Sequence, residues 1–214
     1  MLLRLLCLLL LLPTIPSFAQ ELLRNGNFDR SGLTGLAQDW IAVSQGPRGA
    51  SGFELKAHGT NAGAQKIIVR DLPPFRWSGL GQALPELTPG LYRFRVRVKP
   101  LQPLLAGVEI RGDGPDLVPT ARCRELVKPG IWTELTGFAQ LDGPAQGLYF
   151  LVLLYQPGTL LAADASLQPV ERAALTPAER ATLERQFGPL LPPVDEAALL
   201  ADTTRASCAI APRR

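Results

Sequence analysis

The sequence has 214 residues, of which 46% are hydrophobic and 19% charged, a composition typical of a folded domain and not of a disordered chain or a fibre. Its formal net charge of +3 is too small to predict binding to nucleic acid. One His and one Met leave little material for zinc sites or histidine-based catalysis.

Residues 1–19 have the features of a secretory signal peptide. Arg4 precedes an apolar run from Leu5 to Leu12, and Ser17-Phe18-Ala19 supplies small residues at a cleavage site. The run is shorter than the roughly 20 residues that a helix needs to cross a bilayer. We therefore expect a secreted or periplasmic protein that starts near Gln20 and has no stable membrane insertion after cleavage. An uncleaved membrane anchor is the alternative.

Export would leave two cysteines, Cys123 and Cys208, in the mature chain. In an oxidising compartment such a pair is a candidate disulfide that closes a long loop. Two unpaired thiols are the alternative, because the sequence does not show whether the two sulfur atoms meet.

Residues 20–170 form the expected main domain, a series of short strands separated by turns such as Thr88-Pro89-Gly90 and Asp142-Gly143-Pro144. Many short strands without helical crossovers predict an all-β fold, an antiparallel sandwich or barrel. The expected strands are Glu21–Phe28, Trp40–Ser44, Gly52–Ala57, Ala64–Arg70, Gly79–Leu84, Leu91–Lys99, Gly107–Arg111, Ile131–Leu141, Leu148–Tyr155 and Leu160–Gln168.

In two of these strands, the residue pattern predicts which side chains point to the core and which point outward. In Leu91–Lys99, apolar residues alternate with four cations, so the cations should share the outer face. That row is either an ordinary solvated face or a cationic track for an acidic polysaccharide, with Arg95 at its centre. In Leu148–Tyr155 nearly every residue is apolar, so both faces are covered or one of them meets a ligand.

Residues 171–214 form the expected short C-terminal helical tail. Thr176-Pro177-Ala178-Glu179 is a capping box with Pro at the first helical position, and predicts a helix to about Phe187. Asp195 could cap a second helix through Ala201. The apolar residues Leu175, Leu183, Phe187 and Leu190 would dock the tail on the sandwich; a mobile extension is the alternative.

Several segments together resemble the carbohydrate-binding modules of families 4, 9 and 22, which are galactose-binding-like jelly rolls. Each segment is weak by itself, but their order and spacing fit over most of the mature chain. They are Asn25-Gly26-Asn27-Phe28-Asp29, Trp40, Gly81-Gln82, Pro89-Gly90-Leu91-Tyr92, Trp132-Thr133-Glu134-Leu135 and Ala163-Asp164-Ala165-Ser166-Leu167.

The resemblance implies an antiparallel jelly-roll β-sandwich that binds a polysaccharide or oligosaccharide, neutral or acidic, without catalysis. Members often hold a structural Ca²⁺ near the first and last of these segments, which points to Asp29 and Asp164 as ligands. This chain departs from the family pattern, because Ala163 stands where the family usually has an aspartate. The alternative is that both acids are ordinary strand-end residues.

Sugar binding in such modules uses aromatic rings that stack on pyranose C–H groups, flanked by polar side chains. Phe75 and Trp77 are the first candidates, because they follow the Leu72-Pro73-Pro74 turn. Tyr149 and Tyr155 are the next. Core packing is the competing role for each of these aromatic residues.

Two other classes of function remain open from the sequence. One is a sandwich with only a structural or assembly role in the cell envelope. The other is a small polysaccharide lyase or hydrolase, in which His58 would act as a base. The sequence contains no nucleophile elbow, phosphate-binding loop or zinc-type cysteine spacing.

Overall fold

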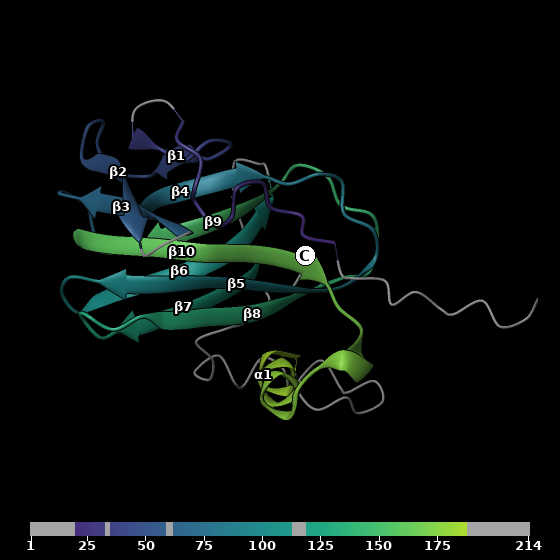
Figure 1. Cartoon of the computed structure of the whole chain (residues 1–214). Coiled ribbons are helices and arrows are strands. Elements are labelled where there is room, and N and C mark those ends of the chain that lie inside the picture. Colours follow the sequence, from purple (N-terminus) through teal and green to yellow (C-terminus); the bar gives the residue numbers. More distant parts are fainter. Residues whose placement is uncertain (1–19, 33–34, 59–61, 113–118, 188–214) are drawn as a thin grey trace, which may run out of the picture.

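The protein is described from a computed structural model, which covers residues 20–32, 35–58, 62–112 and 119–187. Ten strands form two antiparallel five-stranded sheets (Figure 1). Sheet 1 has the order β1-β4-β9-β6-β7, and sheet 2 has the order β2-β3-β10-β5-β8. The strands are β1 (Ile41–Ser44), β2 (Ser51–His58), β3 (Ala62–Val69), β4 (Ser78–Ala83), β5 (Gly90–Pro100), β6 (Leu104–Gly112), β7 (Pro119–Val127), β8 (Thr133–Leu141), β9 (Leu148–Leu154) and β10 (Gly158–Pro169).

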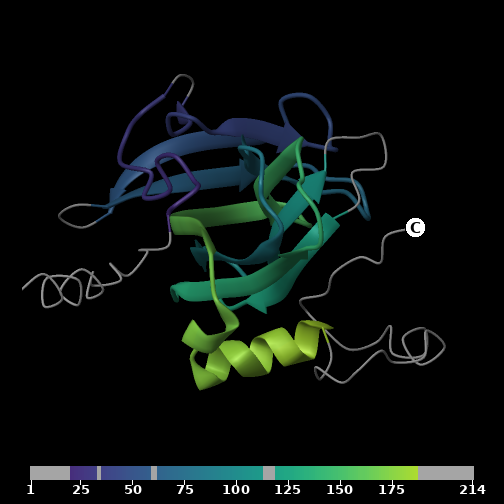
Figure 2. The same cartoon turned by 90° about the vertical axis from the view of Figure 1, so that its right-hand side faces the viewer.

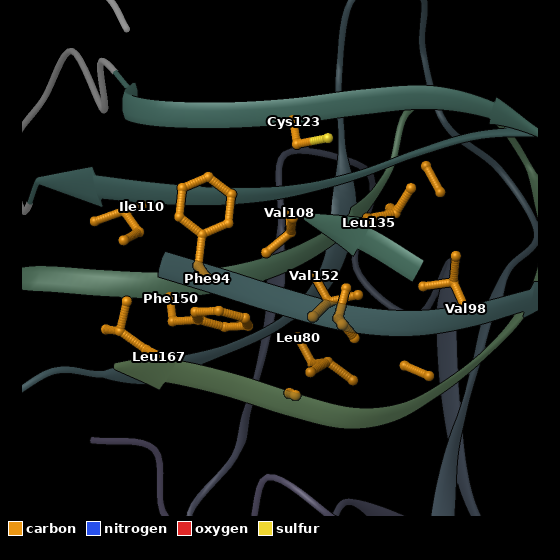
Figure 3. Packing of buried hydrophobic residues seen from close by; sticks show 14 of the residues in the cluster. Leu80, Phe94, Val98, Val108, Ile110, Cys123, Leu135, Phe150, Val152 and Leu167 are labelled. Atoms are coloured by element: carbon orange, nitrogen blue, oxygen red, sulfur yellow. The ribbon is translucent and has the colours of Figure 1, made fainter. Parts of the chain in front are cut away.

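This architecture confirms the predicted jelly-roll β-sandwich. Nine of the ten expected strands are present. The tenth strand of the structure, β7, was not expected. The sheets enclose one core because alternate residues of each strand point between them. Phe94 of sheet 2 and Phe150 of sheet 1 both lie in this core, as do Val108 and Val152 (Figure 3).

The expected strand Glu21–Phe28 is wrong. This segment shares only two backbone hydrogen bonds with β10, from Leu22 N to Leu167 O at 3.0 Å and from Ala165 N to Gly26 O at 2.8 Å, and does not form a strand. Asn25 and Phe28 have φ angles of 50° and 53°, which extended backbone does not allow. The Asn25 side chain holds this loop by donating to the carbonyl oxygens of Arg30 and Gln38. A side chain that satisfies backbone groups in this way replaces a strand ladder.

Residues from the segments that carry the family resemblance contact one another around the first loop. Phe28 is buried and packs on Trp40, with 4.9 Å between ring centroids. Trp40 in turn donates its indole N–H to Asn25 O at 3.1 Å. The buried amide of Gln82 accepts from Arg24 N at 2.7 Å and donates to Arg24 O at 2.8 Å. These residues therefore act in packing and in anchoring the first loop.

The C-terminal part of the described chain contains one helix, α1 (Pro177–Phe187), preceded by the short 3₁₀ helix η2 (Arg172–Ala174). The predicted capping box is present: Glu179 N donates to Thr176 Oγ1 at 3.2 Å, and Thr176 N donates to Glu179 Oε2 at 2.9 Å. Figure 2 shows α1 lying along the outside of the sandwich.

The helix packs on the outer side of sheet 2, at its edge strand β8. Leu175 and Leu183 form a small apolar cluster with Leu91 and Phe138. The backbone N–H of Phe138 donates to Gln186 Oε1 at 3.0 Å. The helix thereby covers part of an edge strand, where unpaired backbone groups invite association with another chain.

Several expectations fall on residues that the structure does not describe. They are the signal peptide (1–19), Cys208, Leu190 and the second tail helix at 195–201. In the described part of the chain, no helix is both long and apolar enough to span a bilayer.

Candidate functional site

The outward face of sheet 1, here called the sheet-1 face, carries an aromatic cluster that is separate from the core. Trp77 packs there with Leu151 and Leu153, and Tyr149 and Tyr155 pack at its sides. Trp77 directly precedes β4, whereas the other four residues come from β9 and its end. The structure thus brings together three of the five residues predicted to bind ligand: Trp77, Tyr149 and Tyr155.

The side chains of β9 lie down over the neighbouring strands because glycines leave room for them. A Cβ atom at Gly81 of β4 would be 2.5 Å from Leu151 Cδ2. A Cβ atom at Gly107 of β6 would be 3.0 Å from Tyr155 Cε2 and 2.8 Å from the carbonyl oxygen of Cys123. Both glycines therefore permit close packing that a side chain would disturb.

A fully buried carboxylate, Glu109, lies beside the aromatic cluster on the same face. It accepts hydrogen bonds from the hydroxyl of Tyr155 and from Nε of Arg111. Nε and Nη2 of Arg124 donate to its Oε1 atom at 3.0 and 2.9 Å. Because a buried charge is costly without partners, these four donated bonds explain how the carboxylate can have no solvent exposure.

The two arginines also contact the aromatic rings. Cζ of Arg124 is 4.0 Å from the centroid of Tyr155, and Cζ of Arg111 is 5.1 Å from the centroid of Trp77. Such cation–π contacts strengthen as water is removed. Trp77 is only 7% exposed, whereas Tyr149, Tyr155 and Arg124 are half-buried and reach the surface of the site.

This environment changes the proton affinity of Tyr155. Burial raises the pKa of Tyr155 above its usual range, and the negative charge of Glu109 raises it further. Burial lowers the pKa of Arg124, but its contacts with Tyr155 and Glu109 outweigh burial and raise the pKa overall. The network is therefore held with Tyr155 protonated and Arg124 charged at neutral pH.

The other two predicted ligand residues lie elsewhere. Phe75 is fully exposed on the connection between β3 and β4, with a φ of 63° that costs an aromatic residue strain. Arg95 lies on β5 of the opposite sheet, where its Nε donates to Ser166 Oγ at 3.2 Å. Arg95 thus belongs to a different face from the aromatic cluster.

The predicted calcium ligands each have another partner. Asp164 pairs with Arg97 at 2.9 Å, and Asp29 Oδ2 accepts from Asn27 Nδ2 at 2.8 Å. Across the described ranges, no three His, Cys, Asp or Glu side chains gather as a metal site would need. This arrangement does not fit a Ca²⁺ ion bound by Asp29 and Asp164 in their present positions, and a calcium site stays a prediction.

A cavity of about 340 Å³ lies away from this face, against the tail. It is lined by residues of η2, α1 and the turn between them, including Leu175, Leu183 and Phe187. None of the residues predicted to bind ligand contributes to it. We therefore place the candidate site on the sheet-1 face.

No family model matches this chain, and no curated protein matches it. Solved structures do match. A CBM22-1 xylan-binding domain from Paenibacillus barcinonensis is 12% identical, with a TM-score of 0.52 over 72% of this chain and 96% of that one. A CBM4 module matches over a similar share of the chain. The chain has the fold of a carbohydrate-binding module.

Enzymes share this fold as well. An apo cyclase from Fischerella sp. is 13% identical, with a TM-score of 0.54 over 72% of this chain and 98% of that one. An arabinose-bound GH51 α-L-arabinofuranosidase is 13% identical, with a TM-score of 0.53 over 71% of this chain. The chain spans only 26% of that hydrolase. At such identities the likeness concerns the fold, which hosts more than one kind of function.

Sequence reasoning missed the charged part of the site: Glu109, Arg111 and Arg124. One signal was available for the first two. In the sequence of β6, Gly107, Glu109 and Arg111 alternate with Ala106, Val108 and Ile110, so the polar set shares the outward face. Arg124 had no such signal, since its strand was not predicted.

Proposed function

We propose that the protein is an exported, non-catalytic carbohydrate-binding module whose ligand meets the sheet-1 face. The observation that carries this proposal is the gathering of Trp77, Tyr149 and Tyr155 beside a buried carboxylate–guanidinium network on one sheet face. The match to sugar-binding modules in fold supports it. The predicted signal peptide supports export.

The chemistry of the face suits a saccharide. The half-buried rings of Tyr149 and Tyr155 offer apolar surface to sugar C–H groups, and the Tyr149 hydroxyl offers a polar partner. Trp77 and Leu153 lie beneath this layer and support it. Because Tyr155 is fixed by its hydrogen bond and by Arg124, little side-chain freedom would be lost on binding.

The acid content of the face supports a role without catalysis. Glycoside hydrolysis uses two carboxyl groups. Among the described outward residues of sheet 1, Glu109 is the single carboxylate, and it is already held by two arginines and a tyrosine. His58 ends β2, in the opposite sheet. A role for His58 in catalysis would be tested by product release from a polysaccharide, with His58→Ala beside the parent protein.

Affinity electrophoresis of the mature protein through polysaccharide gels tests the proposal. We expect retardation by at least one polysaccharide, reduced about tenfold or more by Tyr149→Ala. Ile131→Ala is the matched control, since Ile131 is also exposed but lies between β7 and β8. Phe75→Ala asks whether the ligand extends over the neighbouring loop.

Two results would contradict the proposal. Retardation lost with Arg95→Gln but not with Tyr149→Ala would move the ligand to sheet 2. No retardation by any polysaccharide would favour a structural role in the envelope.

A further inference from the structure

The two outer faces of the sandwich differ in how their cations are balanced. On sheet 2, acids pair with two of the four cations in the row predicted from the sequence, Arg93 and Arg97, and with Lys66 of a neighbouring strand. Three ion pairs lie there: Arg93–Glu179, Arg97–Asp164 and Lys66–Glu54. Arg95, the remaining arginine of the row, donates to the hydroxyl of Ser166 instead. Three cations of this face are therefore each paired with an acid of their own.

The sheet-1 face has an excess of positive charge. Its described outward residues include three guanidinium groups, of Arg111, Arg122 and Arg124, and one carboxylate, of Glu109. The carboxylate is already occupied by Arg111, Arg124 and Tyr155. Arg122 lies directly opposite Glu109 in the β6–β7 register, but the described residues offer it no ion pair.

Arg124 offers a second positive group beside Arg122 for an anionic ligand. Its Nε and Nη2 atoms face Glu109, and its plane lies over the ring of Tyr155. Glu109 and Tyr155 thus fix the guanidinium in place, while its side chain keeps 31% of its surface exposed. A fixed guanidinium binds an anion with less loss of side-chain freedom than a mobile one.

We propose that the sheet-1 face binds an acidic saccharide, with Arg122 as the residue that recognises the carboxylate of a uronic acid. A guanidinium group matches a planar carboxylate through two parallel hydrogen bonds. The guanidinium group of Arg124 attracts the same uronic-acid carboxylate, and Tyr149 and Tyr155 contact the sugar ring. This inference rests on the proposed function, and it moves the acid-binding role from Arg95 to a strand that the sequence did not predict.

The test is affinity electrophoresis in gels that hold a uronic-acid polysaccharide, such as polygalacturonate, alginate or glucuronoxylan. Each polysaccharide is run beside its carboxyl-reduced form, which keeps the backbone and removes the charge. We expect retardation by at least one acidic form, and at least tenfold weaker binding to its reduced form. Arg122→Gln should weaken binding to the acidic form about tenfold, and leave binding to the reduced form unchanged. Arg95→Gln, on the other sheet, is the matched control and should bind as the parent protein does.

The outcomes separate the two levels of the inference. Equal binding to acidic and reduced forms, with no effect of Arg122→Gln, would overturn the acidic ligand and leave sugar binding in place. Absence of binding to any saccharide would overturn the proposed function itself. A sulfated polysaccharide could also retard the protein as strongly as the uronic-acid polysaccharide, with the same loss of retardation in Arg122→Gln. That result would overturn recognition of a carboxylate in favour of general attraction to anions.

Discussion

Tyr155 donates its hydroxyl hydrogen to Oε1 of Glu109, a carboxylate without solvent exposure on the outer face of sheet 1. The two residues come from the end of β9 and from β6, strands that pair in the middle of the sheet. An outward sheet position normally faces water, so a carboxylate buried there depends on the side chains that cover it. This bond therefore joins the aromatic and the charged parts of the proposed site.

Removing the hydroxyl of Tyr155 should destabilise the protein. In Tyr155→Phe the ring can still lie over Gly107 and under Arg124, but Glu109 loses one of its donors. We expect the free energy of unfolding to fall by about 1–3 kcal/mol, the cost of an unsatisfied buried partner. Denaturant unfolding measures it. Tyr149→Phe is the control, because no hydrogen bond of the Tyr149 hydroxyl is present among the described residues; an equal loss in both variants would contradict the role of the bond.

Alkaline pH should weaken the fold through the same residue. Burial raises the pKa of Tyr155 above its unfolded value of 10.0, so the unfolded chain releases this proton first. The stability from protonated Tyr155 is therefore complete below pH 10 and is lost as the pH rises toward the folded pKa. We expect stability to fall by up to about 1.4 kcal/mol per pH unit above pH 10 from this group. Unfolding curves between pH 9 and 11 test this, and a slope unchanged in Tyr155→Phe would contradict it.

The sequence predicted the parts of the fold that depend on period-two alternation. In β5, Phe94, Val96 and Val98 lie in the core and Arg93, Arg95 and Arg97 lie outside, as expected. The alternation of β9 placed Tyr149 and Tyr155 on one face, and the structure has them there. Alternation is a local property, and for that reason it can be read without knowing the partners of a strand.

The parts of the fold that the sequence did not predict depend on strand pairing and on local interruptions of the alternating pattern. In β7, the buried Ala121 and Cys123 alternate with Arg122 and Arg124, but the exposed Glu125 and Leu126 follow and interrupt the pattern. The register that sets Arg124 near Glu109 joins two strands across a connection and is not visible in the sequence. The family likeness at Asn25–Asp29 suggested a strand, where the Asn25 side chain instead holds a loop.

Replacing Glu109 by glutamine should be the most damaging single change in the proposed site. The amide keeps the shape of the carboxylate but not its charge, so two guanidinium groups would be left close together in a buried setting. We expect a loss of about 3–5 kcal/mol in the free energy of unfolding. Glu134→Gln is the matched control on the exposed side of β8 and should change stability by less than about 0.5 kcal/mol. Comparable losses in the two variants would show that Glu109 is not the centre of a buried network.

Acid pH should loosen helix α1 from sheet 2. Burial acts to raise the pKa of Glu179, but hydrogen bonds from Thr176 and Arg93 outweigh it and hold the pKa below its usual value of 4.5. The stability from ionised Glu179 is therefore present above pH 4.5 and is lost as the pH falls through the folded pKa. We expect hydrogen exchange of the α1 amides to rise below pH 4.5 relative to those of β9, after correction for the intrinsic rate. Arg93→Met should raise it already at pH 7, and unchanged protection in that variant would contradict the contact.

The predicted bridge between Cys123 and Cys208 should tie the tail to the sandwich. Cys123 of β7 is 1% exposed and points into the core of the sandwich (Figure 3), and β7 lies beside β8, the strand that α1 contacts. A cross-link over so long a loop would stabilise the fold by about 3–5 kcal/mol in the chain-entropy model. Peptide mapping of unreduced mature protein should find the two cysteine peptides joined, and Cys208→Ser should lower the unfolding free energy by that amount. Two thiols that both react with iodoacetamide in the unfolded, unreduced protein would rule the bridge out.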